Sequence, residues 1–300
     1  MRAKKRNRAI IEGVTAGTLF GTSAIFTRFL GELNAFSITF WRLMIASLAL
    51  TVLASIFRIP FNLNLTRKSL KEISALGIFL GLHFIFFTSA VKDTTILNAT
   101  VLVNMTPIFS TIVSILIFRI KPSRLATLSL IISFIGVCLI AYSETVKSNP
   151  SFQAGVSPTL KGDLEAIFAA LLIAFYLNYG KSLRGRIDMF SSIVPIYLIA
   201  AIFVLIFGLP FMGTSSLPVE TTVTLSLVGL GLIPTAVAHT LYFSSLLGLK
   251  SFEAATIALL EPIVATFLGA VIFVEIPAYL AILGALLVLV GVTFIARQKG

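Results

Sequence analysis

The sequence predicts an all-helical integral membrane protein, with ten transmembrane helices arranged as two inverted five-helix repeats. Three observations predict this fold class. First, 57% of the 300 residues are hydrophobic and only 12% are charged, whereas soluble domains carry ~25% charged residues. Second, apolar stretches of the ~20 residues that a helix needs to cross a bilayer recur along the chain, while the alternating pattern of a membrane β-barrel does not. Third, the second half of the sequence repeats part of the first.

Ten apolar segments are predicted to span the membrane. Their approximate ranges are 9–31, 34–57, 72–92, 94–118, 123–143, 161–181, 189–210, 221–248, 252–274 and 277–296. Residues 1–8 form a basic N-terminal segment. The apolar stretch after them is longer than the hydrophobic region of a signal peptide, so we expect it to remain as the first span. An external linker at 144–160, rich in Ser, Pro, Asn and Gly, separates repeats 9–143 and 161–296, and residues 297–300 form a tail.

The distribution of Lys and Arg predicts the orientation of these spans. With the N-terminus in the cytoplasm, eighteen of the 23 Lys and Arg residues lie in cytoplasmic segments. Only Lys92, Lys147 and Lys161 lie outside, and Arg28 and Arg42 fall within spans. Cytoplasmic loops of membrane proteins are enriched in these residues. We therefore expect a multi-pass protein of the cytoplasmic membrane with both termini in the cytoplasm.

The net charge of +11 does not indicate a nucleic-acid-binding protein. The basic residues occupy short gaps between apolar stretches, and no basic run is interleaved with aromatic residues. The single cysteine, Cys138, lies inside an apolar segment, so an intrachain disulfide is excluded and a small core residue is expected.

An internal repeat is visible without any gap. Residues 83–141 align with 238–296 at a shift of 155 positions. The alignment pairs several identical residues: Pro107-Ile108 with Pro262-Ile263, Thr111 with Thr266, Pro122 with Pro277, and Gly136-Val137 with Gly291-Val292. Because five spans separate the copies, they are expected in opposite orientations. Inverted repeats of this kind are typical of secondary transporters, whose substrate site lies near the midplane between the repeats.

Several short motifs in this order resemble the drug/metabolite transporter superfamily, and specifically the EamA-type exporters. They are Phe20-Gly21-Thr22-Ser23, Phe40-Trp41-Arg42, Thr106-Pro107, Tyr242-Phe243 and Glu261-Pro262. The resemblance covers residues 10–296. It differs at one point: the family often carries a glutamate at the end of each proline-containing span, and Glu275 fits this pattern while Arg119 lies near the corresponding place in the first half.

This resemblance implies export of amino acids, related metabolites or drugs from the bacterial cytoplasm by alternating access without ATP. The sequence agrees in having no G-x-x-x-x-G-K-[ST] motif for nucleotide binding. We expect no cofactor, no metal and no catalytic residue, and we leave the oligomeric state open.

Polar residues near the middle of spans are the first candidates for a substrate site, because a charge in hydrocarbon costs ~2.5 kcal/mol or more. Glu261 directly precedes Pro262 and shares a face with small residues. It is expected to bind a substrate ammonium or carry a proton; the alternative is packing against a neighbouring helix at the proline kink. Asn104 shares a polar face with Thr100 and Thr111, and either lines a wet cavity or joins helices through hydrogen bonds.

The two histidines occupy nearly equivalent places in the two repeats. His83 and His239 are expected to contact substrate or protons, although a buried neutral histidine in a polar contact is the alternative. Tyr242 and Phe87 each follow a histidine by about one turn and are expected to stack on an apolar ligand, with core packing as the alternative.

Four further residues complete the predicted substrate site. Arg42, beside Trp41, lies about two turns into its span, shallow enough to extend towards the outer surface. It is expected either to pair with an acidic residue there or to attract a carboxylate. Asn178 and Tyr179 lie towards the cytoplasmic end of their span and are weaker candidates.

The leading hypothesis is therefore a secondary transporter that exports amino acids or similar small metabolites. Multidrug or nucleoside export is the alternative within the same family, and a channel or lipid scramblase is the alternative of another class. An intramembrane enzyme is disfavoured, because the sequence holds no H-E-x-x-H or G-x-S-x-G motif and no pair of aspartates. We expect a central cavity between the repeats and rocking of the two halves around it.

Overall fold

The computed structural model describes residues 2–31, 33–94, 96–147, 159–212, 220–273 and 278–297. Helices and short connections make up these ranges, and no strand occurs in them. The all-helical class predicted from the sequence is therefore confirmed. Glu275, most of the linker 144–160 and the last three residues lie outside the described part of the chain.

The helices follow the predicted spans closely. In chain order they are α1 (Arg2–Phe20), α2 (Thr22–Arg28), α3 (Ala35–Ile56), α4 (Leu63–Lys68), α5 (Leu70–Asp93), α6 (Ile96–Val103), α7 (Thr106–Leu116), α8 (Arg124–Lys147), α9 (Leu160–Arg184), α10 (Met189–Met212), α11 (Thr221–Leu230), the π-helix η1 (Gly231–His239), α12 (Thr240–Ser245), α13 (Ser251–Ala258), α14 (Glu261–Phe273) and α15 (Tyr279–Arg297).

Seven of the described helical segments are long and apolar enough to cross a membrane, by length and composition. The predicted spans 94–118, 123–143 and 161–181 fall outside this group. The first is interrupted between α6 and α7, and α9, which holds the third, carries charged residues in its first and last turns. The structure thus supports several membrane-crossing helices, while the count of ten remains a prediction.

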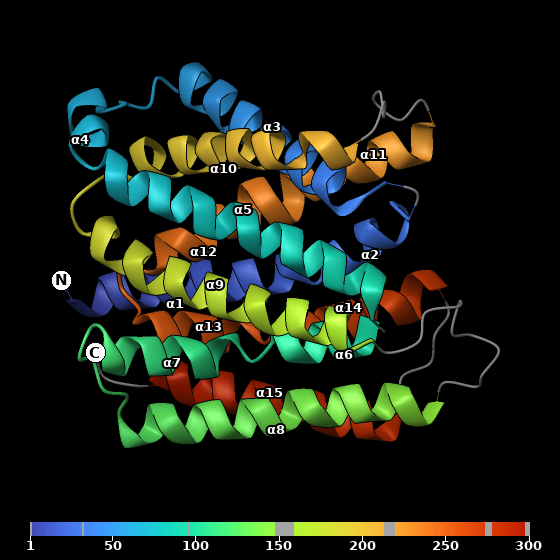
Figure 1. The fold of residues 1–300 in the computed structure, drawn as a ribbon. Coiled ribbons are helices and arrows are strands. Elements are labelled where there is room, and N and C mark those ends of the chain that lie inside the picture. Colours follow the sequence, from blue (N-terminus) through green and yellow to red (C-terminus); the bar gives the residue numbers. More distant parts are fainter. Residues whose placement is uncertain are drawn as a thin grey trace.

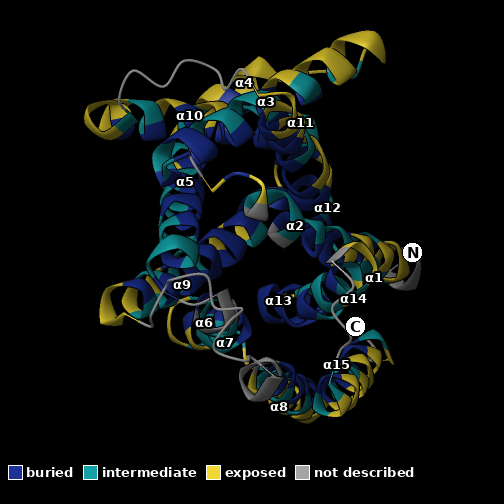
Figure 2. Cartoon of the chain, turned by 90° about the vertical axis from the view of Figure 1, so that its right-hand side faces the viewer, coloured by how far each residue is buried: buried dark blue, intermediate teal, exposed yellow. Residues whose placement is uncertain are grey.

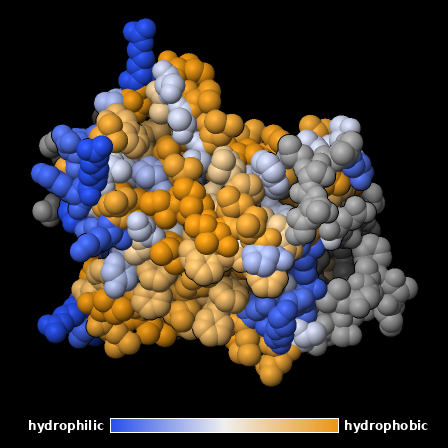
Figure 3. Space-filling model, turned by 45° about the horizontal axis from the view of Figure 1, so that its top comes forward, coloured by the Kyte–Doolittle hydropathy of each residue, from blue (hydrophilic) through white to orange (hydrophobic). Residues whose placement is uncertain are grey.

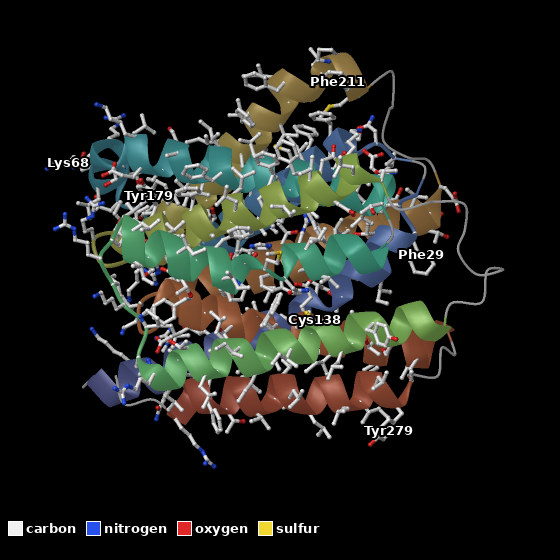
Figure 4. The ribbon with its side chains drawn as sticks, turned by 60° about the horizontal axis from the view of Figure 1, so that its bottom comes forward. Phe29, Lys68, Cys138, Tyr179, Phe211 and Tyr279 are labelled. Atoms are coloured by element: carbon white, nitrogen blue, oxygen red, sulfur yellow. The ribbon has the colours of Figure 1, made fainter. Side chains whose placement is uncertain are left out.

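The arrangement of the helices suits a lipid bilayer. They run roughly side by side, with both termini at one end of the bundle (Figure 1). On the face drawn in Figure 3, hydrophilic side chains gather mainly at that same end, and a broad apolar band covers the middle. Lys68 projects from the end with the termini, whereas Phe29 and Tyr279 lie towards the other end (Figure 4). Below, the two are called the terminal end and the opposite end.

Polar residues at element boundaries set where several helices begin. The side chain of Asn34 accepts a hydrogen bond from the backbone N–H of Ser37 before α3, and Asn62 does the same with Leu65 before α4. Thr159 accepts from the N–H of Gly162 at the start of α9. Such caps satisfy N–H groups that the first turn of a helix leaves free.

The packing brings helices from the two halves of the sequence together. Helix α8 packs along α15, α5 packs along α9, and α10 packs on both α3 and α5. Helix α1 contacts η1, α12 and α13, and α7 contacts α13. Figure 2, which looks along the bundle, shows α8 and α15 as a pair beside the other helices. A Cβ atom at Gly136 would lie 2.6 Å from the carbonyl oxygen of Gly284, so glycine allows the α8 and α15 backbones to touch.

Two helices are broken at matching places in the repeats. The break between α6 and α7 falls at Asn104-Met105, and the break between α13 and α14 falls at Leu259-Leu260, 155 positions later. Each break precedes a proline, Pro107 or Pro262, which has no N–H to donate and restricts the residue before it. The hydroxyl of Thr106 donates to the carbonyl of Val103 at 2.7 Å, the acceptor that Pro107 leaves free.

The two breaks also share their hydrogen bonds. Met105 donates its backbone N–H to Leu102, and Leu260 donates to Ile257, both at 3.2 Å. The hydroxyl of Thr111 donates to the Pro107 carbonyl, and that of Thr266 donates to the Pro262 carbonyl, both at 2.8 Å. The matching sequences therefore produce matching local structures.

The predicted span 221–248 is not a uniform helix. Its central nine residues, Gly231–His239, form a π-helix around Pro234. The hydroxyl of Thr235 donates to the carbonyl of Leu230, five residues earlier, at 2.7 Å. A π-helix makes i to i+5 bonds and is often found at functional sites. Here it sets the direction of Thr235 and His239.

Candidate functional site

A cavity lies in the middle of the bundle, and both halves of the chain contribute to it. Its volume is about 70 Å³. Helices α1, α2, α3, α5, α6 and α7 line it from the first half, and α9, η1, α12, α13 and α14 line it from the second. The lining residues are Phe20, Ser23, Arg42, His83, Phe84, Phe87, Val103, Asn104, Thr106, Pro107, Ile173, His239, Tyr242, Ala255, Ala258, Leu259 and Glu261.

Seven of the ten predicted site residues line this cavity. They are Glu261, Asn104, His83, His239, Tyr242, Phe87 and Arg42. The two helix breaks explain part of this grouping, because Asn104 and Leu259 belong to the breaks themselves and Thr106 and Glu261 begin the helices that follow. The N-terminal ends of α7 and α14 therefore both meet the cavity. Such ends carry unpaired N–H groups and a partial positive charge.

Glu261 is the acidic residue among those that line the cavity. It is the first residue of α14 and is only partly buried. Within the described ranges its carboxylate has no hydrogen bond and no ion pair. It is close enough to Arg42 for the two charges to interact electrostatically. This carboxylate is thus available to a cationic group in the cavity.

Arg42 lies deeper than the sequence predicted. Only 2% of its surface is exposed, so it does not extend towards the outer surface. Arg42 is buried because α3 packs with this face against η1 and α5. Its Nε donates to the hydroxyl of Thr235 at 3.0 Å, and its guanidinium carbon lies 3.8 Å from the ring centroid of Phe84. A stacked, hydrogen-bonded guanidinium has a fixed plane.

The two histidines differ in their partners. His83 is held by the carbonyl of Ala169, 2.9 Å from its Nδ1, which therefore carries the proton. The Nδ1 of His239 is buried and finds no partner in the described part of the chain. The two rings lie 6.5 Å apart, and His239 also packs against Phe20 and Phe84 at 4.6 and 4.9 Å. Together with Tyr242 and Phe87, these rings give the cavity an aromatic wall.

Three predicted residues lie elsewhere. Trp41 packs edge-on against Phe40 and beside an apolar cluster that contains Ile38 and Leu227. Asn178 is 3% exposed and donates to the Ser110 carbonyl, the Ser110 hydroxyl and the Ala174 carbonyl. The bonds to Ser110 join α9 to α7. The alternation of helical faces explains the difference, since Ile173 of the same helix lines the cavity while Asn178 lies about 140° around the axis.

Tyr179 also lies outside the cavity lining. It is 37% exposed, and its ring contacts Phe118 at 5.2 Å and Phe79 at 6.1 Å. Figure 4 shows it among aromatic side chains near the terminal end. The sequence could not separate this face from the neighbouring one, because aromatic residues occur on both.

Buried apolar side chains lie on the terminal side of the cavity lining. Leu177, Leu246 and Phe252, at most 2% exposed, lie between the lining residues and that end. Beyond them, Arg6 donates to both oxygens of Glu253 at 3.2 and 3.1 Å and to the carbonyl of Ile295 at 3.0 Å. This contact ties α1 to α13 and α15. The sequence did not predict this contact, because residues 1–8 were expected to form a basic segment before the first span.

These features define a class of protein. Secondary transporters typically are helical membrane bundles with a central cavity between the two halves of the sequence. Broken helices line that cavity and contribute polar groups to it. The model of the EamA-like transporter family matches this chain twice, at residues 7–142 and 160–297. The protein therefore belongs to the EamA-like transporter family, as its motifs indicated. It is a membrane transporter and not an enzyme.

Named relatives agree with this assignment. The chain is 23% identical to "Uncharacterized transporter YxxF" of Bacillus subtilis over 298 residues, which covers 99% of this chain and 92% of the relative. It is 28% identical to "Uncharacterized transporter YdfC" of the same organism over 262 residues, 85% and 79% of the two chains. An "Uncharacterized transporter" of Archaeoglobus fulgidus is 25% identical over 300 residues, 88% and 98% of the two chains.

A solved crystal structure shares the fold. It superposes with a TM-score of 0.78 at 17% sequence identity and covers 95% of both chains. Similarity at this level of identity concerns the fold alone.

Proposed function

We propose that this protein exports amino acids, or small metabolites that resemble them, across the cytoplasmic membrane by alternating access. The observation that carries the proposal is the unpaired carboxylate of Glu261 at a helix break in the central cavity. A carboxylate kept in a mainly apolar cavity without a protein partner needs a cation to compensate it. The ammonium of an amino acid supplies that cation.

The architecture in this proposal is ten transmembrane helices in two inverted repeats. The matching helix breaks support it, and so does the packing. In this architecture α1 corresponds to α9, α3 to α10, and α5 to the segment of η1 and α12. The contact of α5 with α9 therefore corresponds to that of α12 with α1, and the contact of α10 with α5 corresponds to that of α3 with η1. The pairs α8 with α15 and α3 with α10 each exchange with themselves. A bundle with a two-fold pseudo-axis in the membrane plane has this pattern.

In the proposed orientation both termini are cytoplasmic. The common location of the two termini at one end is consistent with an even number of crossings (Figure 1). The excess of Lys and Arg in the segments of that end supports its cytoplasmic assignment. The cavity is then closed on its cytoplasmic side and receives or releases substrate on the other.

The residues around Glu261 have distinct roles in this proposal. Asn104 and the histidines His83 and His239 surround the polar part of the substrate, while Tyr242 and Phe87 face its apolar part. Rocking of the halves about the breaks before α7 and α14 opens the terminal end and closes the opposite one. The break geometry supports this, because unwound positions at a proline bend more easily than a continuous helix.

Other functions remain as outcomes of the test. Multidrug or nucleoside export would use the same cavity with a different ligand. A channel or lipid scramblase is less compatible with the buried layer of Leu177, Leu246 and Phe252, which interrupts the path on one side.

Counterflow in proteoliposomes tests the proposal. Purified protein is reconstituted with unlabelled amino acid inside, and uptake of labelled amino acid is followed across a panel. The proposal predicts saturable uptake that internal substrate stimulates, and its loss in Glu261→Gln because a neutral amide cannot compensate the ammonium. Glu12→Gln is the matched control, since Glu12 pairs with Arg8 away from the cavity. Absence of counterflow for every amino acid, with folded protein, would contradict the amino-acid assignment.

A further inference from the structure

Arg42 has a hydrogen-bonding capacity that the described part of the protein does not use. Its Nε donates to Thr235, but its two terminal nitrogens have no acceptor there, although the residue is only 2% exposed and lines the cavity. A guanidinium carries five N–H donors in a planar fork. The two terminal nitrogens are not fully buried, unlike the Nε of Arg184. A charged group inside a membrane protein is costly without a partner, so an acceptor that binds in the cavity would stabilise Arg42.

The surroundings of Arg42 fix the direction of these free donors. Thr235, which accepts from Nε, is itself held by its bond to Leu230 and by the hydroxyl of Tyr197, which donates to its carbonyl at 3.0 Å. Phe84 covers one face of the guanidinium. With one face and one edge occupied, the edge formed by the two terminal nitrogens is left for a ligand. Two parallel N–H groups in one plane match the two oxygens of a carboxylate.

The opposite charge lies across the same cavity. Arg42 and Glu261 interact electrostatically, yet no hydrogen bond or ion pair joins them in the described chain. A ligand that carries both an ammonium and a carboxylate would satisfy both residues at once. A simple amine would leave Arg42 without an acceptor, and a simple carboxylic acid would leave Glu261 without a cation.

We propose that Arg42 is the carboxylate-binding residue of the site and that, with Glu261, it restricts the substrate to zwitterions. Thr235 and Phe84 are its positioning residues. This inference rests on the proposed function, because it specifies how the same cavity recognises its substrate. It also assigns a role to η1, where the Thr235 hydroxyl donates to the Leu230 carbonyl and accepts from the arginine.

The test compares ligands that differ only in their charged groups. Three matched sets are alanine, ethylamine and propanoate; leucine, 3-methylbutylamine and 4-methylpentanoate; and phenylalanine, phenethylamine and 3-phenylpropanoate. Binding to purified full-length protein is measured by the ligand-induced shift of the unfolding midpoint. We expect at least one amino acid to bind about tenfold or more tightly than its amine and its acid. Equal binding of amine and amino acid, or no binding by any compound with a carboxylate, would overturn the inference.

Variants assign the effect to the arginine. In Arg42→Gln the preference for the amino acid over its amine should disappear, and Arg42→Lys should retain part of it, because lysine keeps the charge but not the planar fork. Arg184→Gln is the matched control, a buried arginine that does not line the cavity. If Arg42→Gln does not fold, the wild-type comparison and Arg42→Lys decide. A retained preference in a folded Arg42→Gln protein, or in Arg42→Lys at its full wild-type size, would overturn the assignment.

The same measurements separate this inference from the proposed function. Amino acids that bind through Arg42 but give no counterflow would contradict the transport proposal and leave the carboxylate site intact. Amino-acid counterflow that Arg42→Gln leaves unchanged would contradict the carboxylate site and leave the transport proposal intact.

Discussion

At the scale of single residues, the polar side chains in and near the cavity fall into two groups. Some have hydrogen-bond partners within the protein, and others are available to a ligand. His83 and Asn178 donate to protein acceptors. In the described chain the Glu261 carboxylate has no donor, and most of the Arg42 fork has no acceptor. Polar groups inside a membrane protein are costly unless they are paired. The unpaired groups are therefore the better guide to the binding site.

The two histidines provide a matched pair for testing this distinction. Replacement of His83 by Phe removes its bond to the Ala169 carbonyl and should lower the stability by about 1 kcal/mol. Replacement of His239 by Phe removes a buried Nδ1 that has no described partner, so the stability should change by less than about 0.5 kcal/mol or rise. Thermal unfolding of both purified variants measures the difference. Equal losses in the two proteins would contradict this account of their roles.

The sequence identified much of the site at this scale, for a physical reason. Charged and amide groups such as Glu261, Arg42 and Asn104 are rare in spans, so each was conspicuous. Aromatic residues are common, and the sequence could not tell the lining Phe20 and Phe84 from the outward Tyr179. The depth of Arg42 also escaped prediction, since it depends on how η1 and α5 cover α3.

At the scale of elements, the broken helices are the main feature. The span boundaries followed from hydropathy, and the prolines before α7 and α14 were visible in the repeat. The breaks themselves and the π-helix were not predicted, because a proline can kink a helix or end it, and neighbouring helices decide which.

Restoring a continuous helix should impair transport more than folding. In the double variant Pro107→Ala and Pro262→Ala, the missing N–H groups return and alanine favours the helical state. We expect unchanged or higher thermal stability and at least about a tenfold lower counterflow rate, because the halves lose their bending points. Full transport in a folded double variant would remove the breaks from the mechanism.

The Arg6 contact should control opening of the terminal end. Arg6→Ala removes the paired bonds to Glu253 and the bond to Ile295. In a Cys138→Ala background, a cysteine at the lining position Ala255 should then react several-fold faster with an impermeant maleimide added from the terminal side. Arg8→Ala is the control, because the Arg8 side chain is 81% exposed and its pair with Glu12 contributes little. Equal labelling in Arg6→Ala and Arg8→Ala would exclude a closing role.

At the scale of the whole molecule, the sequence repeat predicted more than the identity of single residues. A gap-free shift of 155 positions placed Pro107 and Pro262 at equivalent positions, and the structure has a helix break before each of them. The contact of Arg6 with Glu253 was not predictable, since it joins residues 247 positions apart and does not appear as a motif.

The central claim, that two halves rock around one cavity, is tested most directly by distances at the two ends of the bundle. Spin labels are placed in a Cys138→Ala background at the exposed pairs Arg8 with Arg186 at the terminal end and Phe29 with Leu160 at the opposite end. Double electron–electron resonance is recorded with and without an amino acid that shows counterflow. The account predicts that a longer terminal-end distance accompanies a shorter opposite-end distance. Distances that stay fixed, or that lengthen together, would contradict alternating access.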